Sequence, residues 1–338
     1  MTTSYRVSRL LAGFVVLVQL VTPLLAHAQE KLEKIRIGYP TITPSVGPWW
    51  IAKDAGIFLE EGLDVEMTFI SGGATVVQAV LGGDIRAGYA GTPPIVSAIA
   101  RGAGLSIVAV NQNHLDYVLV SRELFKDPSR LINKKFAISS RGAISEFATR
   151  IALKKLGVNP DNVVMFVVGG SPLRIAALQR GSVDGSILST TEFFQVQDMG
   201  FHPVFEFLKS DVEYPFNVIF VTKRFAKEKK HVVSGIIKGL QRGLRFMQNN
   251  PDRSLHIMAH WLRTPVTDEL RRQWKYVAFD LFEETPYPTE AGFSLLINQM
   301  AERDPAIARL RMGDIVDTSF LDELSRAGFL SKSSQIAR

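Results

Sequence analysis

The order of hydrophobic and polar positions alternates along the chain between short strand-like segments and longer helix-like segments. Residues 34–39 alternate apolar and polar side chains, as in a half-buried strand, and residues 49–55 then show apolar side chains at helical spacing. Gly56 follows this helix, and glycine is the residue type that commonly follows the last helical residue. Strand, polar loop and helix recur in this order through residue 199. Strands that alternate with helices predict βαβ units and a largely parallel sheet.

Two stretches of this pattern share their order and their turn residues, which indicates an internal repeat. Each contains a strand, a glycine turn, a helix, a second glycine and another strand. These landmarks are Gly72-Gly73-Ala74, Gly83 and Ile85 in the first stretch, and Gly169-Gly170-Ser171, Gly181 and Val183 in the second. The spacing differs between the copies by a single residue. A duplicated α/β unit predicts two similar lobes with a cleft between them, and clefts of this kind are where small molecules bind.

The repeat and the remaining pattern predict how the chain is divided. Residues 29–115 are expected to form the first part of one lobe, and residues 116–217 the second lobe. A strand at 217–222 is similar in character to the strand at 117–120, and the chain beyond residue 225 is mostly helical. Residues 218–338 are therefore predicted to supply a return strand and C-terminal helices that complete the first lobe.

The N-terminus has the three parts of a secretory signal. Arg6 and Arg9 form a positive start, residues 10–21 are almost continuously apolar, and Ala26-His27-Ala28 is a small-x-small cleavage site. The apolar run is shorter than the roughly 20 residues of a spanning helix. Residues 1–28 are therefore predicted to be a signal peptide cleaved after Ala28, and the alternative is an uncleaved anchor.

Composition narrows the classes of function. The 338 residues are 46% hydrophobic and 21% charged, which is typical of a globular protein and not of a disordered chain. The chain has no cysteine, which excludes disulfides, thiolate metal ligands, a cysteine nucleophile and a lipid-modified N-terminal cysteine. The formal charge of +6 is modest and comes from scattered Lys and Arg, so a nucleic-acid partner is not expected.

Motifs for catalysis and for cofactor binding are absent from the sequence. It contains no G-x-S-x-G elbow, Walker A loop or G-x-G-x-x-G fingerprint. His256 and His260 stand four apart on a predicted helix, but Ile257 occupies the position where the zinc-protease motif has its Glu. We therefore expect no catalytic residues, no bound metal and no cofactor.

Polar loops with glycine follow several predicted strands. In an open α/β sheet, ligands bind at the carboxyl ends of the strands, and the start of a following helix favours an anion. The candidate ligand-binding residues of these loops and the strands beside them are Thr41, Thr43, Ser45, Trp49, Gly73, Ala74, Thr92, Pro93, Asn111, Ser139, Ser140, Arg141, Gly142, Ala143, Gly170, Ser171, Thr191, Glu192 and Asn217.

Three expectations about these candidates are specific. The loop from Ser139 to Ala143 is predicted to bind an anionic head group through its hydroxyls and free N–H groups, with Arg141 either adding a bidentate contact or facing solvent. The turns Gly72-Gly73 and Gly170-Ser171 are predicted to face each other across the cleft. Trp49 could stack on a ligand ring or belong to the core.

Several segments carry a resemblance to one family of proteins. They are residues 37–39, 51–58 (IAKDAGIF), 61–66 (EGLDVE), 78–84 (QAVLGGD), 91–94 (GTPP), 98–102, 139–144, 176–184 and 215–225. In these segments the chain resembles periplasmic substrate-binding proteins of the sulfonate/taurine/nitrate type, which are grouped with the NMT1/THI5-like proteins. The resemblance implies a two-lobed periplasmic-binding-protein fold of type II (Venus flytrap), an α/β fold in which each lobe is a mixed sheet flanked by helices. It also implies hinge closure about strands near residues 114–117 and 214–218.

The resemblance also implies a function. It implies a monomer, free in the periplasm, that captures a small anionic or heteroaromatic organic ligand and delivers it to an inner-membrane ABC permease with its ATPase. Two alternatives remain open: a periplasmic ligand sensor for a membrane signalling partner, and a thiamine-precursor enzyme. The enzymes of that group rely on a cysteine-rich motif, and a chain without cysteine lacks it.

Overall fold

The computed structural model describes residues 32–141 and 143–330 of the 338. The signal peptide and cleavage site predicted at residues 1–28 lie outside the described residues, as does Gly142. None of the described helices is long and apolar enough to cross a membrane.

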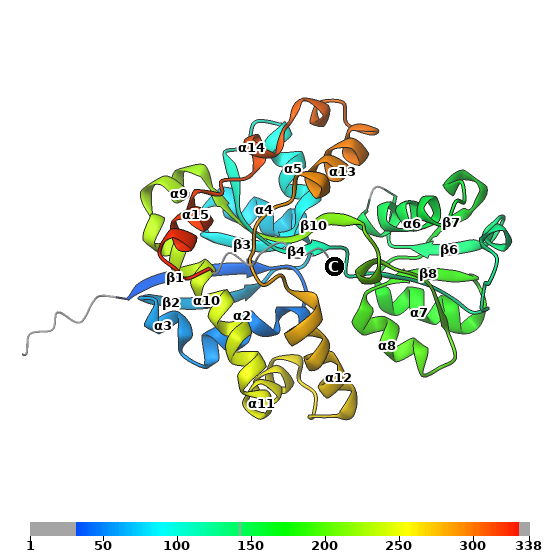
Figure 1. The fold of residues 1–338 in the computed structure, drawn as a ribbon, viewed down its shortest axis with the longest axis horizontal. Coiled ribbons are helices and arrows are strands. Elements are labelled where there is room, and N and C mark those ends of the chain that lie inside the picture. Colours follow the sequence, from blue (N-terminus) through cyan, green and yellow to red (C-terminus); the bar gives the residue numbers. More distant parts are fainter. Residues whose placement is uncertain (1–31, 142, 331–338) are drawn as a thin grey trace, which may run out of the picture.

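The described chain forms two five-stranded sheets, one in each of two lobes (Figure 1). The first sheet has the order β2-β1-β3-β10-β4, and the second has the order β7-β6-β8-β5-β9. The strands of the first sheet are β1 (Glu33–Tyr39), β2 (Leu63–Phe69), β3 (Ala87–Gly91), β4 (Leu105–His114) and β10 (Glu213–Thr222). Those of the second are β5 (Val118–Ser121), β6 (Lys135–Ile138), β7 (Val164–Val167), β8 (Gly185–Leu188) and β9 (His202–Glu206).

The two sheets are built in the same way. In the first, β1 pairs in parallel with β2 and β3, whereas β10 is antiparallel to β3 and β4. In the second, β6 is parallel to β7 and β8, whereas β5 is antiparallel to β8 and β9. This confirms the two-lobed fold with mixed sheets. Four of the five strands in each sheet run in one direction, as a largely parallel sheet does, and the single reversed strand is β10 in the first sheet and β5 in the second.

Helices flank both sheets (Figure 1). Those of the first lobe up to β4 are η2 (Pro44–Val46), α2 (Gly47–Asp54), α3 (Ile57–Glu60), α4 (Gly73–Gly82) and α5 (Thr92–Ala100). Those of the second lobe are η3 (Pro128–Leu131), α6 (Ile144–Lys155), η4 (Pro160–Asn162), α7 (Ser171–Arg180), α8 (Thr190–Gln197) and η5 (Phe207–Lys209). After β10 come α9 (Lys223–Glu228), α10 (Lys230–Asn249), α11 (Pro251–Leu262), α12 (Asp268–Tyr276), η6 (Val277–Leu281), α13 (Glu290–Ala301), η7 (Ile307–Arg309), α14 (Met312–Ile315) and α15 (Ser319–Arg326).

The glycine landmarks of the internal repeat hold equivalent places in the two lobes. α4 follows β2 and ends at Gly83, and α7 follows β7 and ends at Gly181. Both terminal glycines have positive φ, +85° and +72°, the left-handed conformation that glycine adopts without a Cβ penalty. The repeated sequence therefore reflects a repeated strand–turn–helix unit.

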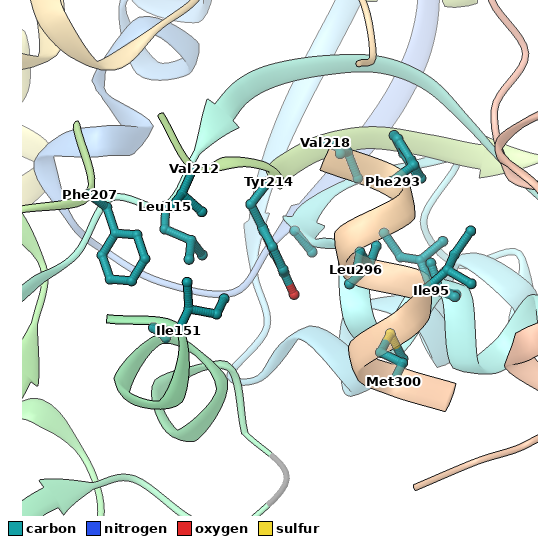
Figure 2. Packing of buried hydrophobic residues seen from close by; sticks show 14 of the residues in the cluster. Ile95, Leu115, Ile151, Phe207, Val212, Tyr214, Val218, Phe293, Leu296 and Met300 are labelled. Carbon is teal, nitrogen blue, oxygen red and sulfur yellow. The ribbon is translucent and has the colours of Figure 1, made fainter. Parts of the chain in front are cut away.

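A single apolar cluster extends from one lobe into the other. It includes Leu115, which follows β4, and Val212 and Tyr214 at the start of β10 (Figure 2). Ile151 of α6 and Phe207 pack in the same cluster on the side of the second lobe. The chain crosses between the sheets at residues 115–117 and 207–212, so both crossings are held by shared hydrophobic packing.

Candidate ligand-binding site

A cavity of about 560 Å³ lies where the two lobes meet. Its wall comes from the loop after β1, from the first turns of α7 and α8, and from the α11–α12 region of the C-terminal segment. Thr43, Ser171, Thr191 and Glu192, four of the residues predicted to bind ligand, line it together. Thr267 and Glu269 line it from the side of α12. The cavity therefore joins polar groups from both sheets and from the C-terminal helices.

The start of α7 presents a hydroxyl that is oriented by a buried arginine. Arg174 is 4% exposed, and its guanidinium donates to the carbonyl of Gly169 at 2.8 Å, the carbonyl of Ile187 at 3.2 Å and the Oγ of Ser171 at 2.9 Å. Burial lowers the pKa of Arg174, and the nearby charge of Glu192 opposes that shift. Because Ser171 Oγ accepts from Arg174, its own proton is available for an acceptor in the cavity.

Arg174 was missed by the sequence analysis. Its signal is a charged residue between Leu173 and Ile175, within the first turns of a helix that follows a glycine turn. Surface helices commonly carry arginine, so the sequence does not distinguish this buried position from an exposed one.

The start of α8 fixes the carboxylate of Glu192. Ser189 caps the helix: its Oγ accepts from the N–H of Glu192 at 3.3 Å, and Glu192 Oε2 accepts from the N–H of Ser189 at 2.9 Å. This reciprocal pair is a capping box. It uses one oxygen of Glu192 and leaves Oε1 beside the cavity.

A buried carboxylate links α8 to α12. Asp116 Oδ1 accepts from the hydroxyl of Tyr276 at 2.6 Å and from the N–H of Thr190 at 3.2 Å. Burial raises the pKa of Asp116 to about 6, although both hydrogen bonds act in the opposite direction. Arg272 of α12 also donates to the carbonyl of Phe194 in α8 at 2.5 Å, and its guanidinium lies 4.6 Å from the centre of the Phe194 ring. The two helices therefore hold one wall of the cavity together.

The residues of α12 that line the cavity were not predicted from the sequence. Thr267 caps the helix by accepting from the N–H of Leu270 at 3.1 Å, and Glu269 Oε1 accepts from the amide of Gln273 at 3.0 Å. These residues lie far along the chain from the strand loops on which the sequence analysis relied. Only the folded arrangement brings them to the cleft.

The structure places several predicted site residues away from the cavity. Trp49 is fully buried in the core between Phe58 and Tyr89, with ring centroids 6.2 and 5.2 Å away, so its ring is not a stacking wall here. Thr92, also fully buried, donates to the carbonyl of Pro215. Asn217 donates to Gln112 at 2.8 Å, and Asn111 is 1% exposed in β4. These side chains belong to the first sheet and to the helices α2 and α5 that pack on it.

The loop predicted to bind the anion has partners within its own lobe. The Oγ of Ser139 lies 2.7 Å from that of Ser145, and Arg141 lies 3.4 Å from Glu146 and donates to the carbonyl of Met165 at 2.9 Å. Ser140 is exposed. The described residues of this loop, Ser139 to Arg141 and Ala143, are not in the cavity lining. Their contact with ligand stays a prediction.

The remaining predicted site residues lie in the loops or first helical turns that follow β1, β2, β3 and β7. Thr41 and Ser45 flank Thr43, and the hydroxyls of Thr43 and Ser45 are 2.8 Å apart. Gly73 and Ala74 begin α4, Pro93 lies in the first turn of α5, and Gly170 precedes α7. Of the two glycine turns predicted to face each other, Ser171 lines the cavity and Gly73 does not.

The described residues offer no metal site. They contain no group of three or more His, Asp or Glu side chains arranged to hold an ion. His256, one of the two histidines considered above, is engaged by its own helix through the carbonyl of Asp252 at 2.7 Å.

Comparison with known proteins agrees with this architecture. Residues 43–254 match the model of a family described as NMT1/THI5 like. The taurine-binding periplasmic protein of Escherichia coli (strain K12) is 27% identical over 161 residues, which is 47% of this chain and 48% of that protein. The match thus spans about half of the length of this curated relative.

Two solved structures share the fold. One is the periplasmic aliphatic sulphonate binding protein SsuA of Escherichia coli, with a TM-score of 0.68, 16% identity, and coverage of 85% of this chain and 92% of that one. The other is the ligand binding component of an ABC-type import system from Staphylococcus aureus, with a TM-score of 0.67, 16% identity, and coverage of 87% and 99%. At these identities the likeness concerns the fold.

Proposed function

The chain belongs to the NMT1/THI5-like family, and from this premise we propose that it is a periplasmic solute-binding protein that captures a small organic ligand between its lobes. In this proposal a signal peptide cleaved after Ala28 exports the protein, which works as a monomer without a cofactor. It delivers its ligand to an inner-membrane ABC permease with its ATPase. The names of its relatives, which include periplasmic binding proteins and a component of an ABC-type import system, support this role.

The observation that carries the proposal is the cavity at the junction of the lobes. Its lining comes from both lobes, so a ligand seated there touches both at once. A ligand that contacts both lobes stabilises their closed arrangement over an open one by its differential affinity for the two. A transport receptor needs this coupling between binding and closure, because the permease must distinguish the closed, ligand-loaded form from the open, empty one.

We assign the acceptor end of the ligand to the start of α7. The Ser171 hydroxyl has a proton to donate, Arg174 lies directly behind it, and the helix N-terminus adds a positive potential. A carboxylate or sulfonate head group fits this combination. This proposal thus assigns the anion-binding role to Ser171, whereas the sequence analysis predicted it for the Ser139–Ala143 loop.

Replacement of Ser171 tests this assignment. Calorimetry across a panel of short sulfonates and carboxylates should identify a binder, and Ser171→Ala should weaken it about tenfold, the effect of losing one charge-assisted hydrogen bond. The control is Ser182→Ala, an exposed serine just beyond the other end of α7. Equal affinity of Ser171→Ala and the parent would place the head group elsewhere.

Uptake separates transport from sensing. A strain that lacks the gene should lose high-affinity uptake of the ligand identified by calorimetry, and the Ser171→Ala gene should restore it incompletely. Unchanged uptake, with loss of a transcriptional response to that ligand, would favour the sensor.

A further inference from the structure

We infer that Asp116 couples closure of the two lobes to the uptake of one proton, so that the cleft closes more readily at acidic pH than at neutral pH. This inference concerns the regulation of the cleft and rests on the proposed function, since a solute-binding protein holds its ligand by closing around it. Asp116 acts on the cavity through α8 and α12, whose residues line it, and is therefore a positioning residue.

Three parts of the chain meet at the carboxyl group of Asp116. The residue lies in the first crossing, between β4 and β5, and its Oδ1 accepts from the N–H of Thr190 in α8 and from the hydroxyl of Tyr276 in α12. Thr190 belongs to the second lobe, whereas Tyr276 packs in one apolar cluster with Ile51 of α2 in the first lobe. Separation of the lobes therefore breaks at least one of these hydrogen bonds and brings water to the carboxyl group.

The carboxyl group of Asp116 is buried without a cationic partner. No described lysine, arginine or histidine forms an ion pair with it. The titratable groups that interact with it are Glu192 of α8, Tyr276 of α12, Tyr89 of β3 and Tyr117 of the crossing. Burial, and to a smaller extent the charge of Glu192, oppose ionisation of Asp116 and raise its pKa from 3.8 to about 6.

Three further charged groups surround this cluster and form no ion pair or hydrogen bond with Asp116. They are Arg174 of α7, which interacts with Glu192 and Tyr117, Asp280 of η6, which interacts with Tyr276, and His114 of β4, which lies 3.7 Å from Glu283. The same groups are present in the parent and in Asp116→Asn. A pH response that this substitution removes therefore belongs to Asp116.

The hydrogen bonds leave room for a proton on the other oxygen of Asp116. Both fall on Oδ1, and Oδ2 accepts none from the described residues. The Oγ1 of Thr190 is buried without a hydrogen-bond partner among the described residues, and the Thr190 side chain acts on the same carboxyl group. A proton on Oδ2 thus keeps both existing hydrogen bonds and adds a donor near an unsatisfied acceptor. The protonated form of Asp116 therefore suits the closed arrangement.

The sign of the pH dependence follows from the two states. In the open form water solvates the carboxylate, so the pKa of Asp116 returns toward 3.8. Between pH 3.8 and about 6 the closed form then binds a proton that the open form lacks. Closure is therefore favoured as the pH falls through about 6, and these values make the ratio of closed to open protein about tenfold larger at pH 5 than at pH 7.

The test measures closure without a ligand. Spin labels at Glu66→Cys on β2 and Lys154→Cys on α6, one exposed position in each lobe, report the distance between the lobes by pulsed electron paramagnetic resonance. The ratio of the short-distance to the long-distance population should rise about tenfold from pH 7 to pH 5 in the parent. It should stay constant in Asp116→Asn, whereas Asp84→Asn, which changes an exposed aspartate shortly after α4, should respond as the parent does.

A second variant carries the test if Asp116→Asn does not fold. The hydroxyl of Tyr276 stabilises the carboxylate and so lowers the pKa of Asp116. Its removal in Tyr276→Phe should move the midpoint of the pH response to a higher pH. A hydroxyl with a merely structural role would, on removal, lower the closed population at every pH and leave the midpoint unchanged.

The outcomes separate this inference from the function on which it rests. Equal ratios at pH 5 and pH 7 in the parent, the same pH response in Asp116→Asn as in the parent, or an unmoved midpoint in Tyr276→Phe would overturn the inference and leave the solute-binding proposal in place. If the pH response is as expected but calorimetry finds no binder among the sulfonates and carboxylates, the coupling of closure to a proton stands and the solute-binding proposal is contradicted.

Discussion

Asp116 lies at the point where the chain leaves the first sheet for the second, and it is 5% exposed. The hydroxyl of Tyr276 reaches it from the C-terminal helices, and the N–H of Thr190 reaches it from the second lobe. The charge of Glu192, two residues beyond Thr190 in α8, also raises the pKa of Asp116, to a smaller extent than burial does. One carboxylate thus joins both sides of the cleft.

The raised pKa of Asp116 makes the stability of the protein depend on pH. The ordinary pKa of an aspartate, which applies to the unfolded chain, is 3.8, whereas the pKa of Asp116 in the folded protein is about 6. Between these two pH values the folded state therefore binds more protons than the unfolded state. The contribution of this group is therefore fully present below pH 3.8 and is lost as the pH rises through about 6. The asparagine of the Asp116→Asn variant does not ionise, so this variant lacks the pH-dependent loss of stability. The midpoint of thermal unfolding of this variant, relative to the parent, should rise from pH 4.5 to pH 7 and then level off.

Titration of other groups affects both proteins equally, so the comparison isolates Asp116. A difference in midpoint that stays constant over this range would show that Asp116 is not protonated near pH 6. Asn keeps the acceptor oxygen for Tyr276 and Thr190, and the variant therefore retains the link between the lobes.

Single residues also show where sequence reasoning stops. The strand-end loops were identified from their polar and glycine residues, and four predicted residues from three of these loops line one cavity. Trp49 and Thr92 sit beside such loops in the sequence but point into the first lobe, because the first turns of α2 and α5 pack on the sheet. A sequence assigns a residue to a helix start, but the direction of its side chain depends on packing.

At the level of elements, α6 and α13 are joined by an ion pair across the lobes. Glu146 of α6 has a side chain that is only 1% exposed, and Arg303, just after α13, approaches its Oε1 to 2.8 Å. Arg141 and Arg150 of the second lobe lie 3.4 Å from the same oxygen. The guanidinium of Arg303 also lies 5.2 Å from the ring centre of Phe147. This contact holds the lobes together at α6 and α13, as α8 and α12 do beside the cavity.

Removal of Arg303 should loosen this side of the cleft. Arg141 and Arg150 still neutralise Glu146 in Arg303→Ala, so the fold should persist with a loss of stability on the order of 1 kcal/mol. The radius of gyration of the ligand-free protein, measured by small-angle scattering, should increase. Arg309→Ala, an exposed arginine of η7, is the control. Identical scattering from both variants would show that the ion pair does not restrain the lobes.

Elements differ in how well the sequence predicts them. The repeated β2–α4 and β7–α7 units were predicted because their period and glycine turns are local. β9 was missed: Pro203 interrupts its pattern, and it pairs with β5 as an edge strand with a register shift beside that proline. The part of α12 that lines the cavity was missed for another reason. Residues 267–273 lie more than two hundred positions after Thr43 in the sequence, and only the tertiary fold brings them to the same cavity.

The whole molecule consists of two similar lobes joined by two crossings that share one apolar cluster (Figure 2). Such packing resists twisting and shear but permits a hinge motion, since few residues cross between the sheets. β10 begins at Glu213, so the second crossing lies before the residues 214–218 where the sequence placed a hinge. Inter-lobe contacts through Asp116 and Glu146 on either side favour a closed arrangement.

The central claim is that a small molecule bound between the lobes closes them. The chain has no cysteine, so Glu66→Cys on β2 and Lys154→Cys on α6, both exposed, allow one spin label to be placed on each lobe. The most direct measurement is the distance distribution between these labels, by pulsed electron paramagnetic resonance, with and without a saturating concentration of the sulfonate or carboxylate that calorimetry identifies as a binder. The account predicts a distribution that shifts to shorter distances and narrows with ligand, and a smaller shift in the Ser171→Ala background. If calorimetry verifies saturation and the distance distribution is nevertheless unchanged, the claim that ligand binding closes the lobes is contradicted.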